Sequence, residues 1–197
     1  GYDQFARVGS TDTTRTNADS TITVISTENG YDNAARVNHT DTRIDSPDGT
    51  TTTDSTDFTY DEFSRVGDTS TDRINPDGTL TQIDSANSYD AFDRVIHTST
   101  DITAADGTVT NDSTDLSYDQ FARVDGTDTI RTAPDGSATT ISSGNSFDQF
   151  GRVDATSTDI VDAAGVATHD ETSSTYDGFA RVSDTETLRT TGAGAET

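Results

Sequence analysis

The chain has no cysteine, methionine or tryptophan, only 3 prolines, and no long hydrophobic run. The absence of cysteine excludes disulfide bonds and thiolate metal sites. No stretch approaches the roughly 18 consecutive apolar residues of a membrane-spanning helix, so we expect no membrane span. Hydrophobic residues make up 28% of the 197 residues, which is too little for a large globular core. These absences favour a thin structure in which each segment needs few inward side chains.

The charge is strongly one-sided, with a net charge of −24 and no lysine among the 12 positive residues. A surface this acidic repels polyanions, which excludes nucleic acid as a partner. Divalent cations are the partners that the charge favours. Neither the EF-hand spacing nor the glycine-rich calcium repeat is present. We therefore expect no cofactor, with calcium as the alternative.

A Tyr-Asp pair, once Phe-Asp, recurs with a period of 29 residues, as from Tyr2 to Tyr31. The repeats start at Tyr2, Tyr31, Tyr60, Tyr89, Tyr118, Phe147 and Tyr176. Residues 1–197 are predicted to form a single repeat array whose last copy is incomplete, and we interpret them as a segment of a longer chain. Catalysis needs a unique set of different groups, whereas here most informative residues recur in every copy. The chain is predicted not to be an enzyme.

Each repeat has the pattern of a β-hairpin. Numbered from its Tyr, a repeat carries Thr at positions 10 and 12, then a turn, then Thr at position 22, and no helical period competes. Turns such as Ser46-Pro47-Asp48-Gly49 suit a chain reversal, because Pro fixes φ and Gly supplies a positive φ; degenerate versions lie at Asp19-Ser20 and Ala164-Gly165. The predicted fold is all-β, with tandem 29-residue hairpins stacked into an elongated, solenoid-like or spiralling sheet.

The Tyr-Asp segment is predicted to form the corner that links one hairpin to the next. Position 2 is Asp and position 6 is Arg in every copy, beginning with Asp3 and Arg7. One reading is a carboxylate-guanidinium site; the reading that we favour is a structural corner, in which Asp caps backbone amides and Arg pairs with a carboxylate or carbonyl. We expect Phe at position 4 and Val at position 7 to anchor this corner to the core. The representative corner residues are Asp3, Arg7, Asp61, Arg65, Asp119 and Arg123.

Alternate copies reveal a second period of 58 residues. Position 14 is Arg in odd copies and Ile in even copies, whereas position 24 is Ile in odd copies and Asp in even copies. If the second strand of a repeat lies beside the first strand of the next, apolar and ionic junctions alternate; pairing inside a hairpin would set Arg beside Ile and Ile beside Asp. The predicted apolar pairs are Ile25 with Ile44, Ile83 with Ile102, and Ile141 with Ile160; the predicted ionic pairs are Asp54 with Arg73, Asp112 with Arg131, and Asp170 with Arg189. The alternation is predicted to fix the register, although a simple duplication of two repeats would also produce the period.

Few other residues have the pattern of a site. His39 and His97 share position 9 of even copies, and His169 stands elsewhere; they are metal ligands or variable exposed residues, and we favour the second interpretation. Asn38 and Asn111 match the N-glycosylation pattern, at a frequency close to chance in a chain so rich in Asn, Thr and Ser.

The segment Tyr-Asp-x-Phe-x-Arg-Val resembles the YD repeat of Rhs proteins, Tc-toxin cocoon subunits and teneurins, whose motif is close to Tyr-Asp-x-x-Gly-Arg followed by Leu or Val. Residues 147–153 come nearest to it, with Gly151 before Arg152. The resemblance implies hairpins wound into a spiralling extracellular or toxin-enclosing sheet. In this chain, however, the Gly is usually Ala, Ser or Asp, the repeat is longer and more regular, and aromatic filling is thin, which favours a narrow fibre over a hollow shell.

Together these patterns predict a structural protein: an extracellular or cell-surface fibre, stalk or matrix element whose partner is itself, through neighbouring repeats or identical chains. The alternatives are an adhesin or other binding module and a YD-type shell enclosing a toxin cargo.

Overall fold

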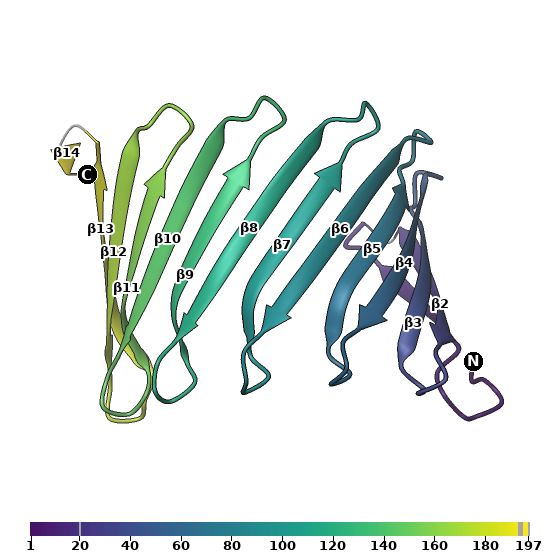
Figure 1. Cartoon of the computed structure of the whole chain (residues 1–197), viewed down its shortest axis with the longest axis horizontal. Coiled ribbons are helices and arrows are strands. Elements are labelled where there is room, and N and C mark those ends of the chain that lie inside the picture. Colours follow the sequence, from purple (N-terminus) through teal and green to yellow (C-terminus); the bar gives the residue numbers. More distant parts are fainter. Residues whose placement is uncertain (20, 193–194, 197) are drawn as a thin grey trace. The chain divides into compact units, whose positions relative to one another are not determined.

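The computed structural model describes residues 1–19, 21–192 and 195–196. The strands are β1 (Ser10–Thr16), β2 (Ile22–Tyr31), β3 (Val37–Asp45), β4 (Thr51–Tyr60), β5 (Val66–Ile74), β6 (Leu80–Tyr89), β7 (Val95–Thr103), β8 (Val109–Tyr118), β9 (Val124–Thr132), β10 (Ala138–Phe147), β11 (Val153–Val161), β12 (Ala167–Tyr176), β13 (Val182–Thr191) and β14 (Ala195–Glu196) (Figure 1). The described residues contain no helix, so none of them belongs to a helix able to cross a bilayer.

The chain divides into two compact units. The first unit comprises Gly1–Asn87 and Thr100–Val109, and the second comprises Ser88–Ser99 and Thr110–Thr197. In the first unit, β1 to β5 and most of β6 pair antiparallel in chain order. In the second unit, β8 to β14 do the same. The prediction of an all-β fold of tandem antiparallel hairpins is confirmed.

The hairpin turns follow the chemistry that their sequences predict. At Ser46, the backbone N–H donates to Thr50 O at 2.9 Å, and the Gly49 N–H donates back to Ser46 O at 3.0 Å. Gly49 has a φ of 84°, which a side chain would resist. The Asp48 carboxylate accepts the Thr50 N–H at 2.9 Å and so closes the turn. The degenerate turn at Gly165 has the same geometry, with a φ of 79°, whereas Ser20 of the other degenerate turn lies outside the described residues.

Registers inside the hairpins differ from one sequence-based expectation. Arg15 lies opposite Thr23, and Ile25 lies opposite Thr13. The expectation that hairpin pairing would set Arg beside Ile is therefore wrong, because the turn length aligns position 14 with position 22. Inner strands also pair on both sides, so β3, for example, contacts both β2 and β4. Contacts inside repeats and contacts between repeats thus coexist. Inside a hairpin such as this one, Thr lies opposite the residues at positions 14 and 24, which alternate between odd and even copies.

A buried core is absent from the part of the chain that the structure describes. The corner phenylalanines are among the most exposed side chains, from 67% for Phe63 to 82% for Phe179. Val182 of the last corner is also 57% exposed. The prediction that Phe and Val anchor the corner to a core is wrong for these residues. Because these strands have no buried core, specific contacts between neighbouring strands must supply the stability and register that a hydrophobic core supplies in globular proteins.

Candidate functional site: the Tyr-Asp corners and the inter-repeat junctions

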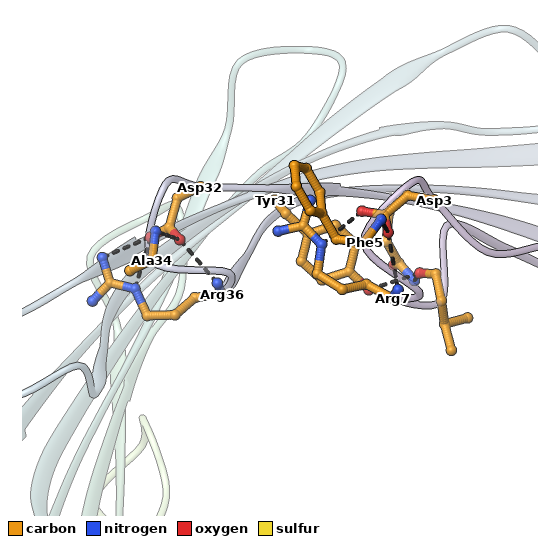
Figure 2. Close-up of polar contacts among 9 residues, drawn as sticks. Asp3, Phe5, Arg7, Tyr31, Asp32, Ala34 and Arg36 are labelled. Carbon is orange, nitrogen blue, oxygen red and sulfur yellow. Dashed lines mark hydrogen bonds and ion pairs between the residues drawn. The ribbon is translucent and has the colours of Figure 1, made fainter.

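The first corner is closed by the carboxylate of Asp3 (Figure 2). Its Oδ1 accepts the backbone N–H groups of Phe5 and Arg7, both at 2.9 Å, and its Oδ2 accepts the Arg7 Nε–H at 2.6 Å. The Asp3 N–H in turn donates to Arg7 O at 2.9 Å. One side chain thus satisfies two backbone donors and a guanidinium, which is the capped corner favoured from the sequence.

The other corners repeat this geometry. In the corner of Asp61, Oδ1 accepts the Arg65 N–H at 2.9 Å and Oδ2 accepts the Arg65 Nε–H at 2.6 Å. In the corner of Asp119, the Arg123 Nε–H donates to Oδ2 at 2.7 Å. Hydrogen bonding to the charged form lowers a carboxyl pKa. The Arg123 side chain accordingly lowers the pKa of Asp119 below its ordinary value, against the opposing effect of burial.

Position 5 of the corner needs a left-handed backbone. Gly151 has a φ of 80° there, and Ala6 adopts a φ of 61° although its Cβ disfavours it. The other non-glycine residues with this conformation are Ala35, Ser64, Asp93, Ala122 and Ala180. Glycine therefore suits this position for a physical reason, and this chain carries strain where another residue stands there.

Corner arginines also contact the following repeat. The Cζ of Arg7 lies 4.1 Å from the ring centroid of Tyr31 and 5.0 Å from that of Phe5, so the guanidinium packs between the aromatic rings of two repeats (Figure 2). The equivalent contacts to the next repeat are Arg36 over Tyr60 at 4.3 Å, Arg94 over Tyr118 at 4.4 Å, Arg123 over Phe147 at 3.9 Å and Arg152 over Tyr176 at 4.2 Å. The Tyr31 hydroxyl completes the link by donating to Val8 O at 2.7 Å. The corner is thus also a joint between repeats.

The ionic junctions have bidentate geometry. Arg73 lies opposite Asp54 in the register of β4 and β5, and its Nε and Nη2 each donate to one carboxylate oxygen of Asp54 at 2.8 Å. The same pairing joins Asp112 to Arg131 at 2.7 Å, and Asp170 to Arg189 at 2.6 Å. Two parallel N–H···O bonds constrain the angle as well as the distance. Such a pair therefore fixes one strand against the next.

The apolar junctions lie at the matching places of the alternate boundaries. Ile25 lies opposite Ile44 on β2 and β3, and Ile141 lies opposite Ile160 on β10 and β11. Ile83 on β6 and Ile102 on β7 stand at the same positions of the boundary between them, and their pairing stays a prediction. The hydroxyls of Ser85 and Thr100, which would neighbour this pair, do hydrogen-bond at 2.9 Å.

A row of hydroxyl pairs runs beside these junctions. It joins position 26 of one repeat to position 12 of the next, and consists of Thr56 with Thr71 (2.9 Å), Ser85 with Thr100 (2.9 Å), Thr114 with Thr129 (2.9 Å), Ser143 with Thr158 (3.1 Å) and Thr172 with Thr187 (3.0 Å). The position-12 threonines recognised in the sequence are thus contacts between repeats.

An asparagine that the sequence analysis missed belongs to the odd repeats. The Asn29 side chain donates to Val8 O at 3.1 Å and accepts from the Thr40 hydroxyl at 3.1 Å, so it bridges neighbouring strands. Asn145 makes the same contacts with Val124 O, at 3.2 Å, and Thr156, at 2.9 Å. The sequence does carry a signal for this contact, because position 28 of the repeat is Asn in odd copies and Phe, Leu or Ser in even copies.

The histidines all face carboxylates. The Nδ1 of His39 lies 2.7 Å from Asp57 Oδ1, and its Nε2 lies 3.1 Å from Asp41 Oδ2. The Asp57 hydrogen bond raises the pKa of His39, with a smaller contribution from Asp41. His97 pairs with Asp115, and His169 with Asp159, each at 2.7 Å. No group of three or more His, Cys, Asp or Glu side chains in the described chain is arranged to hold a metal ion.

The sequon asparagines lie on strands. Asn38 is exposed on β3, whereas Asn111 is half-buried on β8 and donates to Ser99 Oγ at 3.4 Å. A glycan on Asn111 would have to displace that bond, so Asn38 is the more accessible acceptor.

No protein-family model matches the chain, and no curated protein matches it. The repeat geometry itself is therefore the basis for any functional inference.

Proposed function

We propose that the chain is a structural protein: an extracellular or cell-surface fibre, stalk or matrix element built from tandem YD-like β-hairpin repeats. The observation that carries this proposal is the joint between repeats. Arg7 stacks on Tyr31, Asp54 pairs with Arg73, and equivalent contacts recur along each unit. The side chains that distinguish the repeats, namely the corner arginines and the residues of the ionic junctions, thus bind the next repeat. A load-bearing or spacing element requires such contacts between successive repeats.

In such a fibre, the acidic surface would keep neighbouring chains apart. A net charge of −24 keeps identical chains apart in low salt, and divalent cations are the partners that would bridge them. Light scattering and thermal unfolding with added calcium, and again after chelation, test this point. An unchanged particle size and unfolding temperature would restrict the acidity to a role in solubility.

Force spectroscopy of the full chain tests the structural role. An array held by similar joints should lengthen in steps of one or two repeats. At about 3.3–3.6 Å per extended residue, these steps are roughly 100 Å for 29 residues or 200 Å for 58 residues. Steps of the longer size would indicate that the pair of repeats is the mechanical unit. Extension without measurable resistance, or a single step that releases the whole chain, would contradict a load-bearing role.

Exposed phenylalanines favour the alternative of an adhesin or other binding module. Phe92 and Phe179 are 78% and 82% exposed, and large exposed aromatic side chains often mark contact surfaces. The same exposure weighs against a shell filled by inward aromatic side chains. Replacing the corner phenylalanines with serine should leave the force steps largely unchanged if the role is structural, and should abolish attachment to a target surface if the role is adhesive.

A further inference from the structure

The corners of the second unit place four exposed phenylalanine rings in a row. These side chains are between 68% and 82% exposed, and each ring centroid lies 5.0–5.3 Å from the Cζ of the arginine in its own corner. Contacts such as that of Arg123 over Phe147, at 3.9 Å, then lead to the next corner. We call this row the aromatic strip; it comprises Phe92, Phe121, Phe150 and Phe179 with Arg94, Arg123, Arg152 and Arg181.

The corners are nearly neutral, unlike the rest of this unit. Positions 1 to 7 of these four repeats hold five aspartates and four arginines. Each arginine pairs with the aspartate of its own corner, as where Arg152 Nε donates to Asp148 Oδ2 at 2.6 Å. The remainder of the unit has 13 Asp or Glu residues against two arginines. Two copies of the chain therefore repel each other over most of their surface and approach most easily corner to corner.

A cleft lies between two neighbouring corners of the strip. It has a volume of about 600 Å³ and is lined by Phe121 and Arg123 from one corner and by Phe147, Phe150 and Gly151 from the next. Gly151 leaves room in it, because a Cβ at this residue would lie 3.0 Å from Arg123 Nη1. The cleft is thus a mainly aromatic recess that a further ring can enter.

A ring from a second copy fits the distance between neighbouring corners. The corners are two strands apart, which is at least about 9–10 Å. A ring placed midway lies roughly 5 Å from each neighbour, within the range of about 4.5–7 Å at which aromatic rings attract. Four rings of this exposure can bury about 400–800 Å² on each copy, against about 800 Å² per partner in a standard interface. The area suits a weak, reversible dimer.

We propose that the aromatic strip is a self-association surface, which binds the same strip of a second copy of the chain. The two strips run antiparallel about a twofold axis, so that the rings of each copy enter the spaces between the rings of the other. Further repeats on either side would lengthen the strip without covering it, because each repeat contacts only its neighbours along the chain. The inference rests on the proposed structural role, to which it adds the surface for lateral contact.

Sedimentation velocity of the intact chain over a range of concentrations tests this inference. A chelator is present throughout, so that divalent cations cannot bridge the chains. An interface of this size should give a dissociation constant of about 1 μM or weaker. Raising the salt from about 0.1 M to about 1 M shortens the Debye length from about 10 Å to about 3 Å and should strengthen the dimer, because repulsion is screened while the apolar contact remains.

Two double variants locate the contact. Phe121→Ser with Phe150→Ser removes the rings that line the cleft and should weaken the dimer at least about tenfold. The matched control is Phe5→Ser with Phe63→Ser in the first unit, where Ala34 interrupts the row of rings. This control removes the same number of exposed rings and should dimerise as the unmodified chain does. Circular dichroism establishes that both variants keep the fold.

Three outcomes would overturn the inference: a chain that stays monomeric at millimolar concentration, equal dimerisation of the two double variants, or a dimer that high salt dissociates. The first outcome would leave the strip to a different partner. The force steps are measured on single chains. Absence of the dimer with intact force steps would therefore reject the self-association surface alone, whereas absence of the steps would reject the structural role.

Discussion

Relieving the strained backbone at position 5 of the corner should stabilise the protein. Ala122 has a φ of 62°, where its Cβ costs about 1–2 kcal/mol relative to a right-handed backbone. Replacement by glycine removes that strain but gives the unfolded chain more freedom, which costs about 0.4–1 kcal/mol. The net stabilisation of Ala122→Gly should therefore be about 0.5–1 kcal/mol.

The same change can be combined across corners. The equivalent alanines are Ala6, Ala35, Ala122 and Ala180. Distant sites usually add, so the fourfold variant should gain about 2–4 kcal/mol. For a chain of this size each kcal/mol raises the melting temperature by about 2–4 °C, which gives roughly 4–16 °C in total. Thermal unfolding followed by far-ultraviolet circular dichroism measures this shift.

Gly151 supplies the opposite test. It has a φ of 80°, and a Cβ at this residue would lie 3.0 Å from Arg123 Nη1, against the guanidinium that stacks on Phe147. Gly151→Ala should therefore lower the melting temperature. The reasoning is refuted if Ala122→Gly is destabilising, or if Gly151→Ala is neutral, because the corner would then not impose a left-handed backbone.

Three further predictions concern the tyrosine hydroxyl, the corner aspartates and His39. Tyr118→Phe removes the hydroxyl that donates to Val95 O at 2.7 Å and should lower the free energy of unfolding by about 0.5–1.5 kcal/mol. Phe147→Leu removes only the ring contact with the corner arginine and serves as the comparison. Equal stability of Tyr118→Phe and the unmodified chain would contradict the contact between repeats. Because hydrogen bonds lower the pKa values of the corner aspartates, their stabilisation is complete above about pH 3.9 and should be lost as the pH falls through the lowered values, in an acid titration of unfolding. The pKa of His39 is raised beside Asp57, so the contribution of His39 to the free energy of unfolding is complete below about pH 6.5 and should fade as the pH rises through the raised value. A His39→Gln variant should lose this pH dependence of stability. An unchanged pH profile in that variant would contradict the His39–Asp57 pair.

The sequence predicted the hairpins and junctions because their signals are local or periodic. Pro47, Asp48 and Gly49 specify a turn by their own backbone preferences. Asp54 and Arg73 stand at equivalent junction positions, and a period of 58 residues makes their complementarity visible. In a repeated sequence, the copies can be compared with one another within one chain. Positions that change together between copies, such as 14 and 24, indicate residues that pair across strands.

The corner was predicted less well because its contacts depend on three-dimensional direction. The expectation that the corner Phe is anchored to a core fails at Phe63, which is 67% exposed and whose ring centroid lies 4.8 Å from Arg65 Cζ. Stacking of Arg7 on Tyr31 joins side chains whose orientation no spacing rule gives. The hairpin register, in contrast, was within reach, since closure of the turn between Ser46 and Thr50 already aligns Ile44 with Thr52.

A charge-swap cycle at Asp54 and Arg73 tests most directly whether the alternating junctions hold the repeats in register. The variants are Asp54→Arg, Arg73→Asp and the double swap, each unfolded in urea at low and moderate salt. The Arg73 side chain is 42% exposed, so the pair itself should contribute only about 0.2–1 kcal/mol. The account predicts that each single swap destabilises the chain and that the double swap recovers most of the loss, with a coupling of at least about 0.5 kcal/mol. Additive effects of the two swaps would contradict it.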